Sequence, residues 1–117
     1  MFKISQEATY KWPVTVHIPR DGGKFVKATF TAEFMALPQD KIDSVLEDIR
    51  AGDRDADFAT ECLVGWSGVQ DTDGSDLPYS DEAKGKLLNM SYVRNAVVTD
   101  FFESISGGAA RRKNLQR

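Results

Sequence analysis

Two runs of alternating apolar and polar residues stand near the start of the chain. Residues 10–18 and residues 26–34 each place an apolar side chain at every second position. The apolar positions are Tyr10, Trp12, Val14, Val16 and Ile18 in the first run, and Val26, Ala28, Phe30, Ala32 and Phe34 in the second. A period of two predicts half-buried β-strands. Asp21-Gly22-Gly23 between the runs favours a tight reversal, because glycine adopts left-handed φ at no steric cost. The pattern therefore predicts a β-hairpin with one apolar face.

Pro13 interrupts the polar face of the first run. Proline has no N–H for a β-ladder, so this strand is expected at a sheet edge. An isolated hairpin is marginally stable in water, so helices or another subunit must cover its apolar face. Phe2 and Ile4 are candidates for a short third strand.

Helical periodicity replaces the alternation from Pro38 onward. Pro38 suits the first turn of a helix, where a missing N–H costs nothing, and Gly52 suits its C-terminal end. The apolar positions between them follow helical spacing: Ile42, Val45, Leu46 and Ile49. These residues predict an amphipathic helix.

The acids Asp53, Asp55 and Asp57 predict a second helix from about Ala56, because carboxylates accept from the free N–H groups of a helix N-terminus. Its expected buried stripe is Phe58, Cys62, Leu63 and Trp66, and Gly65 and Gly68 are expected to end it. Residues 69–80 are rich in Asp, Gly and Ser, which predicts an exposed acidic loop. Trp66 is the expected structural anchor at the base of this loop.

Two further helices are expected, with Ser80 and Ser91 as N-caps. The last one carries Val93, Val97, Phe101 and Ile105 at intervals of four, and Val98 and Phe102 widen its apolar stripe. The predicted fold class is α+β: an N-terminal β-hairpin, alone or within a small antiparallel sheet, packed against about four α-helices. Residues 1–108 form the expected single domain, and residues 109–117 a flexible basic tail.

The composition argues against nucleic acid and a membrane as partners. The 117 residues carry a net charge of −3, whereas broad phosphate binding normally needs a basic excess, so nucleic acid is not an expected partner. The chain shows no signal peptide and no apolar run long enough to cross a bilayer, so we expect a cytoplasmic protein without a membrane partner.

Candidate chemistry is sparse. Cys62 is the single cysteine and falls on an apolar helix face, which favours a buried reduced thiol over a nucleophile. Aligning Gly74 with the sixth position of an EF-hand loop puts Val69 and Ser80 at the first and last ligand positions, where neither supplies a carboxylate. We therefore expect no catalytic residue, no metal and no cofactor, in a protein that is not an enzyme.

The remaining feature is a large apolar load on the hairpin and the last helix. These residues either form the core or stay partly exposed to hold an apolar partner, and periodicity alone leaves both open. The candidate partner-binding residues are Phe30, Phe34, Val97, Phe101 and Phe102.

Several segments resemble the tail assembly chaperones of long-tailed double-stranded DNA phages, over about residues 8–115. They are Phe30–Phe34, the helix Ile42–Ile49, the segment Leu63–Val69, Asp73-Gly74, Leu77–Ser80, the last helix and Lys113-Asn114. The resemblance implies a non-enzymatic α+β protein that self-associates as a homo-oligomer and binds the tape measure protein, keeping it soluble until the tail tube polymerises. It also implies a host-cytoplasmic protein absent from the mature virion. In some members a longer frameshifted form of the same protein is a further partner.

Two alternatives stay open. The first is a structural or adaptor component of the phage particle, such as a head-tail connector or minor tail protein, which would remain in the virion. The second is a small enzyme or regulator that uses the acids between Asp53 and Asp76.

Overall fold

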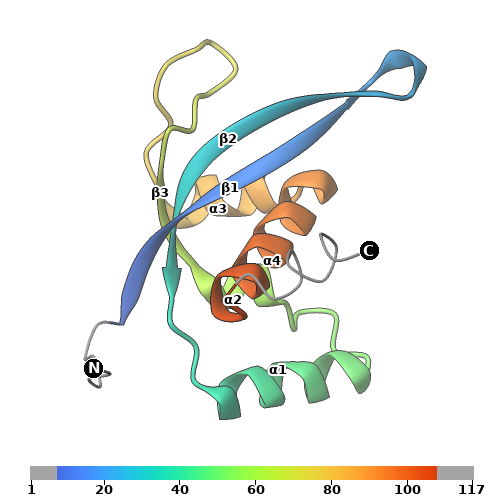
Figure 1. The fold of residues 1–117 in the computed structure, drawn as a ribbon, viewed down its shortest axis with the longest axis vertical. Coiled ribbons are helices and arrows are strands. Elements are labelled where there is room, and N and C mark those ends of the chain that lie inside the picture. The colour runs from blue at the N-terminus through green and yellow to red at the C-terminus, as the bar shows by residue number, and fades with distance from the viewer. Residues whose placement is uncertain (1–7, 108–117) are drawn as a thin grey trace.

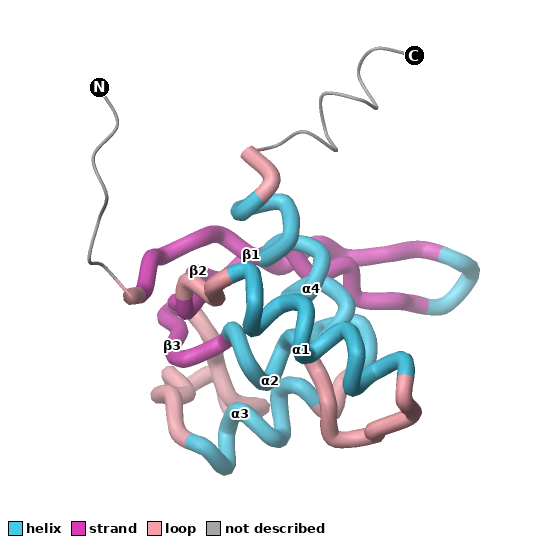
Figure 2. The backbone as a smooth tube through the Cα atoms, turned by 90° about the horizontal axis from the view of Figure 1, so that it is seen from below, coloured by secondary structure: helices cyan, strands magenta, loops and turns pink. Residues whose placement is uncertain are grey.

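The computed structural model describes residues 8–107, which form a helical layer on one face of a small sheet (Figures 1 and 2). The elements of this part are β1 (Thr9–Arg20), β2 (Lys24–Met35), α1 (Gln39–Arg50), α2 (Phe58–Cys62), β3 (Leu63–Ser67), α3 (Asp81–Leu88) and α4 (Ser91–Ile105). A 3-10 turn, Asp21–Gly23, joins β1 to β2. The predicted α+β class with an N-terminal hairpin is confirmed. The expected strand at Phe2 and Ile4 and the expected basic tail lie outside the described residues.

β1 and β2 form the predicted hairpin. They pair antiparallel without interruption from Thr9 opposite Met35 to Arg20 opposite Lys24. The strand order β1-β2-β3 places β1 at the edge, as Pro13 predicts. The Thr15 N–H points to the outer side of β1, where it donates to the Asp100 carboxylate of α4 at 3.0 Å. Since backbone direction alternates along a strand, the nitrogen of Pro13 faces the same open side and breaks no ladder bond.

The third strand comes from the middle of the chain, where a helix was expected as far as Trp66. The helical prediction is wrong beyond Cys62: residues Leu63–Ser67 form β3, which pairs antiparallel with β2 from Thr31 to Phe34. Edge pairing supplies backbone partners to both strands and overrides the apparent helical spacing. A Cβ at Gly65 would lie 3.0 Å from the Glu33 Oε1 atom, so glycine fits this close approach.

The helices start close to their predicted positions. α1 begins directly after Pro38, and the Ser80 hydroxyl caps α3 by accepting from the Ala83 N–H at 3.0 Å. The expected capping by Ser91 is wrong, because Ser91 is the first residue inside α4, and Met90 occupies the cap position without a side-chain bond. Ile49, expected in the buried stripe of α1, is 42% exposed.

Aromatic contacts join the sheet to the helices. Phe34 of β2 meets Phe101 of α4 edge to face at 5.5 Å between ring centroids, and Phe101 meets Phe102 at 5.4 Å. Phe102 in turn meets Phe58 of α2 at 4.9 Å, in a smaller apolar cluster that includes Ile42 of α1. Phe102 therefore connects the main core to the cluster that holds α1 in place.

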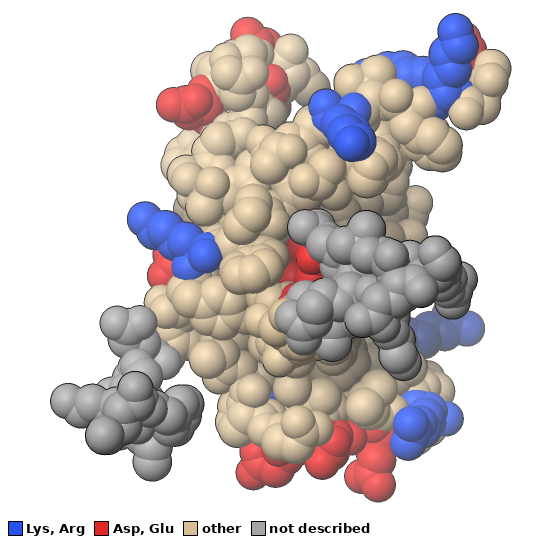
Figure 3. Space-filling model, in the orientation of Figure 1, with Lys and Arg blue, Asp and Glu red and all other residues tan. Residues whose placement is uncertain are grey.

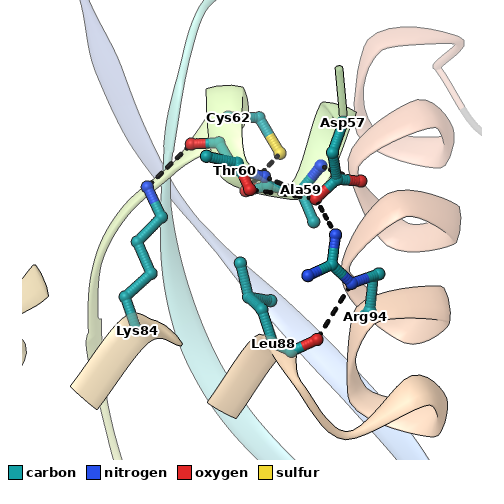
Figure 4. Close-up of polar contacts among 7 residues, drawn as sticks. All are labelled: Asp57, Ala59, Thr60, Cys62, Lys84, Leu88 and Arg94. Carbon is teal, nitrogen blue, oxygen red and sulfur yellow. Dashed lines mark hydrogen bonds and ion pairs between the residues drawn. The ribbon is translucent and has the colours of Figure 1, made fainter. Parts of the chain in front are cut away.

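One polar junction links three helices (Figure 4). Asp57 caps α2: its carboxylate accepts from the backbone N–H groups of Ala59 and Thr60, at 3.4 and 3.2 Å. The same carboxylate pairs with the Arg94 guanidinium of α4, whose Nε atom donates to the Leu88 carbonyl at the end of α3 at 2.9 Å. Asp57 and Arg94 thus connect the start of α2 to the end of α3 through α4.

Replacing Asp57 by Ala should lower the free energy of unfolding by about 2 kcal/mol, through loss of a helix cap and a charge-assisted hydrogen bond. Arg94→Ala should cost less, about 1 kcal/mol or below, because the Arg94 side chain is 40% exposed and water screens its charge. Urea unfolding of both variants measures this order. Asp55→Ala is the matched control, expected within about 0.5 kcal/mol of wild type; a control loss equal to that of Asp57→Ala would contradict the cap assignment.

Candidate functional site

Four of the five predicted partner-binding residues lie inside the protein. Phe34, Val97 and Phe101 are fully buried, and Phe30 is 8% exposed. Phe30 reaches the surface only as part of the lining of an apolar hollow of about 210 Å³. The folded surface of the described chain does not present Phe34, Val97 and Phe101 to a partner, and the core interpretation accounts for these three residues. Their placement corrects the expectation that they line a binding surface. Phe102 differs, because it is only partly buried.

Phe102 reaches a shallow apolar hollow of about 520 Å³ beside the last turns of α4. Thr99, Glu103, Ile105 and Ser106 complete its lining. Ile105 is 45% exposed, so the hollow carries an accessible aliphatic side chain beside an aromatic one. An apolar face of this kind suits the apolar stripe of a partner helix.

Trp66 lies at the base of the acidic loop, as predicted for an anchor. Its indole N–H donates to the Leu77 carbonyl at 2.8 Å, and its ring meets Tyr79 edge to face at 5.0 Å. The Leu77 N–H donates to the Val69 carbonyl at 2.8 Å, which closes the loop at the same place. Trp66 thus holds the returning end of the loop against β3.

We define the acidic loop as residues 69–77, which contain Asp71, Asp73 and Asp76 and no Lys or Arg. Gln70 forms a β-bridge with Asp76, and Gly74, with φ of 84°, makes the turn. Hydrogen bonds from the Ser75 hydroxyl and the Ser75 N–H hold the pKa of Asp73 below its usual value. No group of three or more His, Cys, Asp or Glu residues in the described part of the chain is arranged to hold a metal ion.

A second surface feature was missed in the sequence. We define the hairpin arm as residues 18–28, the far half of the β1-β2 hairpin, which projects beyond the helical layer (Figures 1 and 2). Phe25 is 65% exposed and Val26 is 47% exposed at its tip. Alternation predicted Val26 on the buried face, but the helices end before they reach it. The sequence signal for this arm was the length of the two alternating runs, which extend past the residues that the helices can cover.

Cys62 is the one cysteine of the chain, and its side chain is fully buried in the main core. Burial raises the pKa of the Cys62 thiol to about 12. The thiol is therefore neutral near pH 7 and shielded from reagents in solution, which matches the predicted buried reduced cysteine.

Cys62 should react with a thiol reagent at pH 8 only when the chain unfolds. The folded thiol ionises near pH 12 and the unfolded one near 9.0, so the unfolded chain releases this proton first. The stabilisation from the neutral buried thiol is complete below pH 9.0 and is lost as the pH rises toward 12. Unfolding free energies should therefore fall faster above pH 9.0 for wild type than for Cys62→Ala. Parallel curves, or rapid labelling of the folded protein, would contradict this assignment.

Fluorescence tests the anchor. In a Trp12→Phe variant the remaining emission comes from Trp66, which should emit at shorter wavelength in the folded protein than in urea, because its ring packs against Tyr79. Tyr79→Ser should shift this emission toward longer wavelength, because it removes the ring that packs on Trp66. Folded-state emission at the wavelength of a water-exposed indole would exclude the anchor role.

Comparison with known proteins places the chain in a family. No helix among residues 8–107 is long and apolar enough to cross a membrane. Neither the curated proteins nor the solved structures include a match to this chain. A family model described as the YdaY prophage protein matches residues 39–117, which begin with the first residue of α1 and include β3 and the helices that follow. The match covers more than half of the chain, so this phage-derived protein belongs to the YdaY prophage protein family.

Proposed function

We propose that this protein is a tail assembly chaperone of a long-tailed phage. In this role it is not an enzyme: it self-associates and binds the tape measure protein, which it keeps soluble in the host cytoplasm until the tail tube polymerises. Membership of a prophage protein family supports a role in a phage, and the resemblance to the chaperones supports this particular one. A longer frameshifted form would join the same complex.

The observation that carries the proposal is the apolar hollow on α4. Phe102 lines the hollow and packs against both apolar clusters, and Ile105 is an exposed side chain of the same lining. This combination gives a firmly supported apolar surface, which suits the stripe of a helical partner better than a mobile side chain would. The tape measure protein of such phages is largely helical, so it has the chemistry that this hollow would bind.

The acid-rich surface supports the same role. Asp40, Asp43, Glu47 and Asp48 are exposed on α1, and the acidic loop adds three more carboxylates. Net negative charge keeps a protein soluble and disfavours aggregation. A complex coated by such chains would therefore stay in solution while its apolar contacts are covered.

Co-expression with the tape measure protein of the same phage tests the proposal. The tape measure protein should be soluble only when this chain is present, and a tag on either protein should recover both. Ile105→Asp should lower the recovered tape measure protein by about tenfold, because it puts a charge into the apolar contact. Ile49→Asp is the matched control, since Ile49 is 42% exposed on α1, and it should leave recovery unchanged.

Two results would contradict the chaperone role. One is a folded chain that neither binds nor solubilises the tape measure protein. The other is this chain in purified virions, which would favour a head-tail connector or minor tail protein.

A further inference from the structure

The hairpin arm overhangs an apolar hollow that ends at the base of the acidic loop. This hollow measures about 210 Å³ and lies between the arm, the loop base and the α3-α4 junction. Its apolar lining includes Val16, Ile18, Val69, Met90, Tyr92 and Val93. Small-molecule sites usually measure about 300–1,000 Å³. The hollow is thus better matched to one or two apolar side chains than to a metabolite.

The tip of the arm carries two apolar side chains that remain exposed in the single chain. Phe25 lies on one face of the arm, and Val26 lies on the other beside Ile18. Phe25 and Val26 are respectively 65% and 47% exposed. Covering both would remove a large apolar area from water at about 25 cal/mol per Å².

The arm and the acidic loop have opposite charges. The arm contains Arg20, Lys24 and Lys27 against one acid, Asp21, whereas the loop contains three Asp and no base. Figure 3 shows the acids of the loop and the bases of the arm at two separate corners of the same side of the molecule. Within one chain the two features stay apart, so neither neutralises the other.

Exposed lysines also argue against pairing between two arms. β3 covers β2 only from Thr31 to Phe34, so in the described structure the strand edge over residues 24–30 has no neighbouring strand. Two such edges in contact would bring Lys24 and Lys27 close to the same residues of the second arm. Lysines on an edge strand oppose that association, so an acidic surface is the better partner.

We propose that the hairpin arm docks on a second copy of this chain. The tip residue Phe25 enters the hollow of the second copy, and Arg20, Lys24 and Lys27 face its acidic loop. Because the arm and the hollow lie on the same side of one chain, a two-fold axis lets both copies make this contact at once, which closes a dimer. The inference rests on the self-association included in the proposed function, and it identifies the surfaces that carry it.

Sedimentation of the chain alone, over a range of concentrations, tests the apolar part. Wild type should form a dimer, and Phe25→Ser should raise the dissociation constant by about tenfold or more. Met35→Ser is the matched control, because Met35 is 40% exposed at the opposite end of β2 and should leave dimerisation unchanged. Circular dichroism should show both variants folded. A wild type that stays monomeric, or a dimer equally stable in Phe25→Ser, overturns the proposal.

A charge exchange tests which surfaces meet. One variant carries Arg20→Glu, Lys24→Glu and Lys27→Glu, and the other carries Asp71→Lys, Asp73→Lys and Asp76→Lys. Each alone should be a monomer, since its arm and its loop then have the same sign. Mixed together they should form a heterodimer, in which both arm-loop contacts are again of opposite sign, and added salt should weaken it. Failure of the mixture to pair overturns the proposal.

These measurements contain no tape measure protein, so they separate the two proposals. Loss of the dimer in Phe25→Ser with binding of the tape measure protein retained would support both. A monomeric chain that still solubilises the tape measure protein would overturn the arm contact alone. An arm-dependent dimer that does not bind the tape measure protein would overturn the chaperone role alone.

Discussion

The length of the apolar face of the hairpin is the constraint on which the rest of the structure depends. Two strands of 12 residues each present an apolar side chain at alternate positions, and water must be excluded from that face. The helices cover the half of the hairpin that lies away from the turn, where Val14, Ala32 and Phe34 are fully buried. They do not reach the turn. One half of the hairpin thus packs against the helices in the core. The other half, formed by the same two strands, projects beyond the helices.

Short elements are held in place by side chains from long ones. α2 has five residues and β3 has five, and neither would be stable alone. Asp57 and Arg94 attach the start of α2 to α4, while the Lys84 ammonium of α3 donates to the Thr60 carbonyl at 2.7 Å. α4, at 15 residues, carries Phe101 against the sheet and Phe102 against the α1 cluster. The longest helix therefore contributes side chains to both apolar clusters and to the polar junction.

Sequence reasoning succeeded where local chemistry determines structure. The hairpin, the turn at Asp21-Gly22-Gly23, the start of α1 and the Ser80 cap all depend on residues close together in the chain. It failed at Leu63–Ser67, because this segment becomes a strand only through the edge of β2, about 30 residues earlier. For the candidate site, the sequence did not show how far the helical layer extends along the hairpin. Val26 and Phe30 belong to one alternating run, yet Val26 is exposed and Phe30 is buried, because the helical layer ends between them. Burial of Phe101 beside partial exposure of Phe102 is likewise a property of the assembled layers.

The outer edge of β1 has a consequence for how the protein behaves at high concentration. An exposed strand edge invites other chains to add to the sheet, which is a route to amyloid-like aggregation. Two successive backbone nitrogens that face away from β2 offer no free N–H to another strand. Pro13 has no N–H, and the Thr15 N–H already donates to Asp100. A foreign strand approaching the middle of β1 would find no continuous ladder to extend. The edge thus favours solubility over open-ended strand addition.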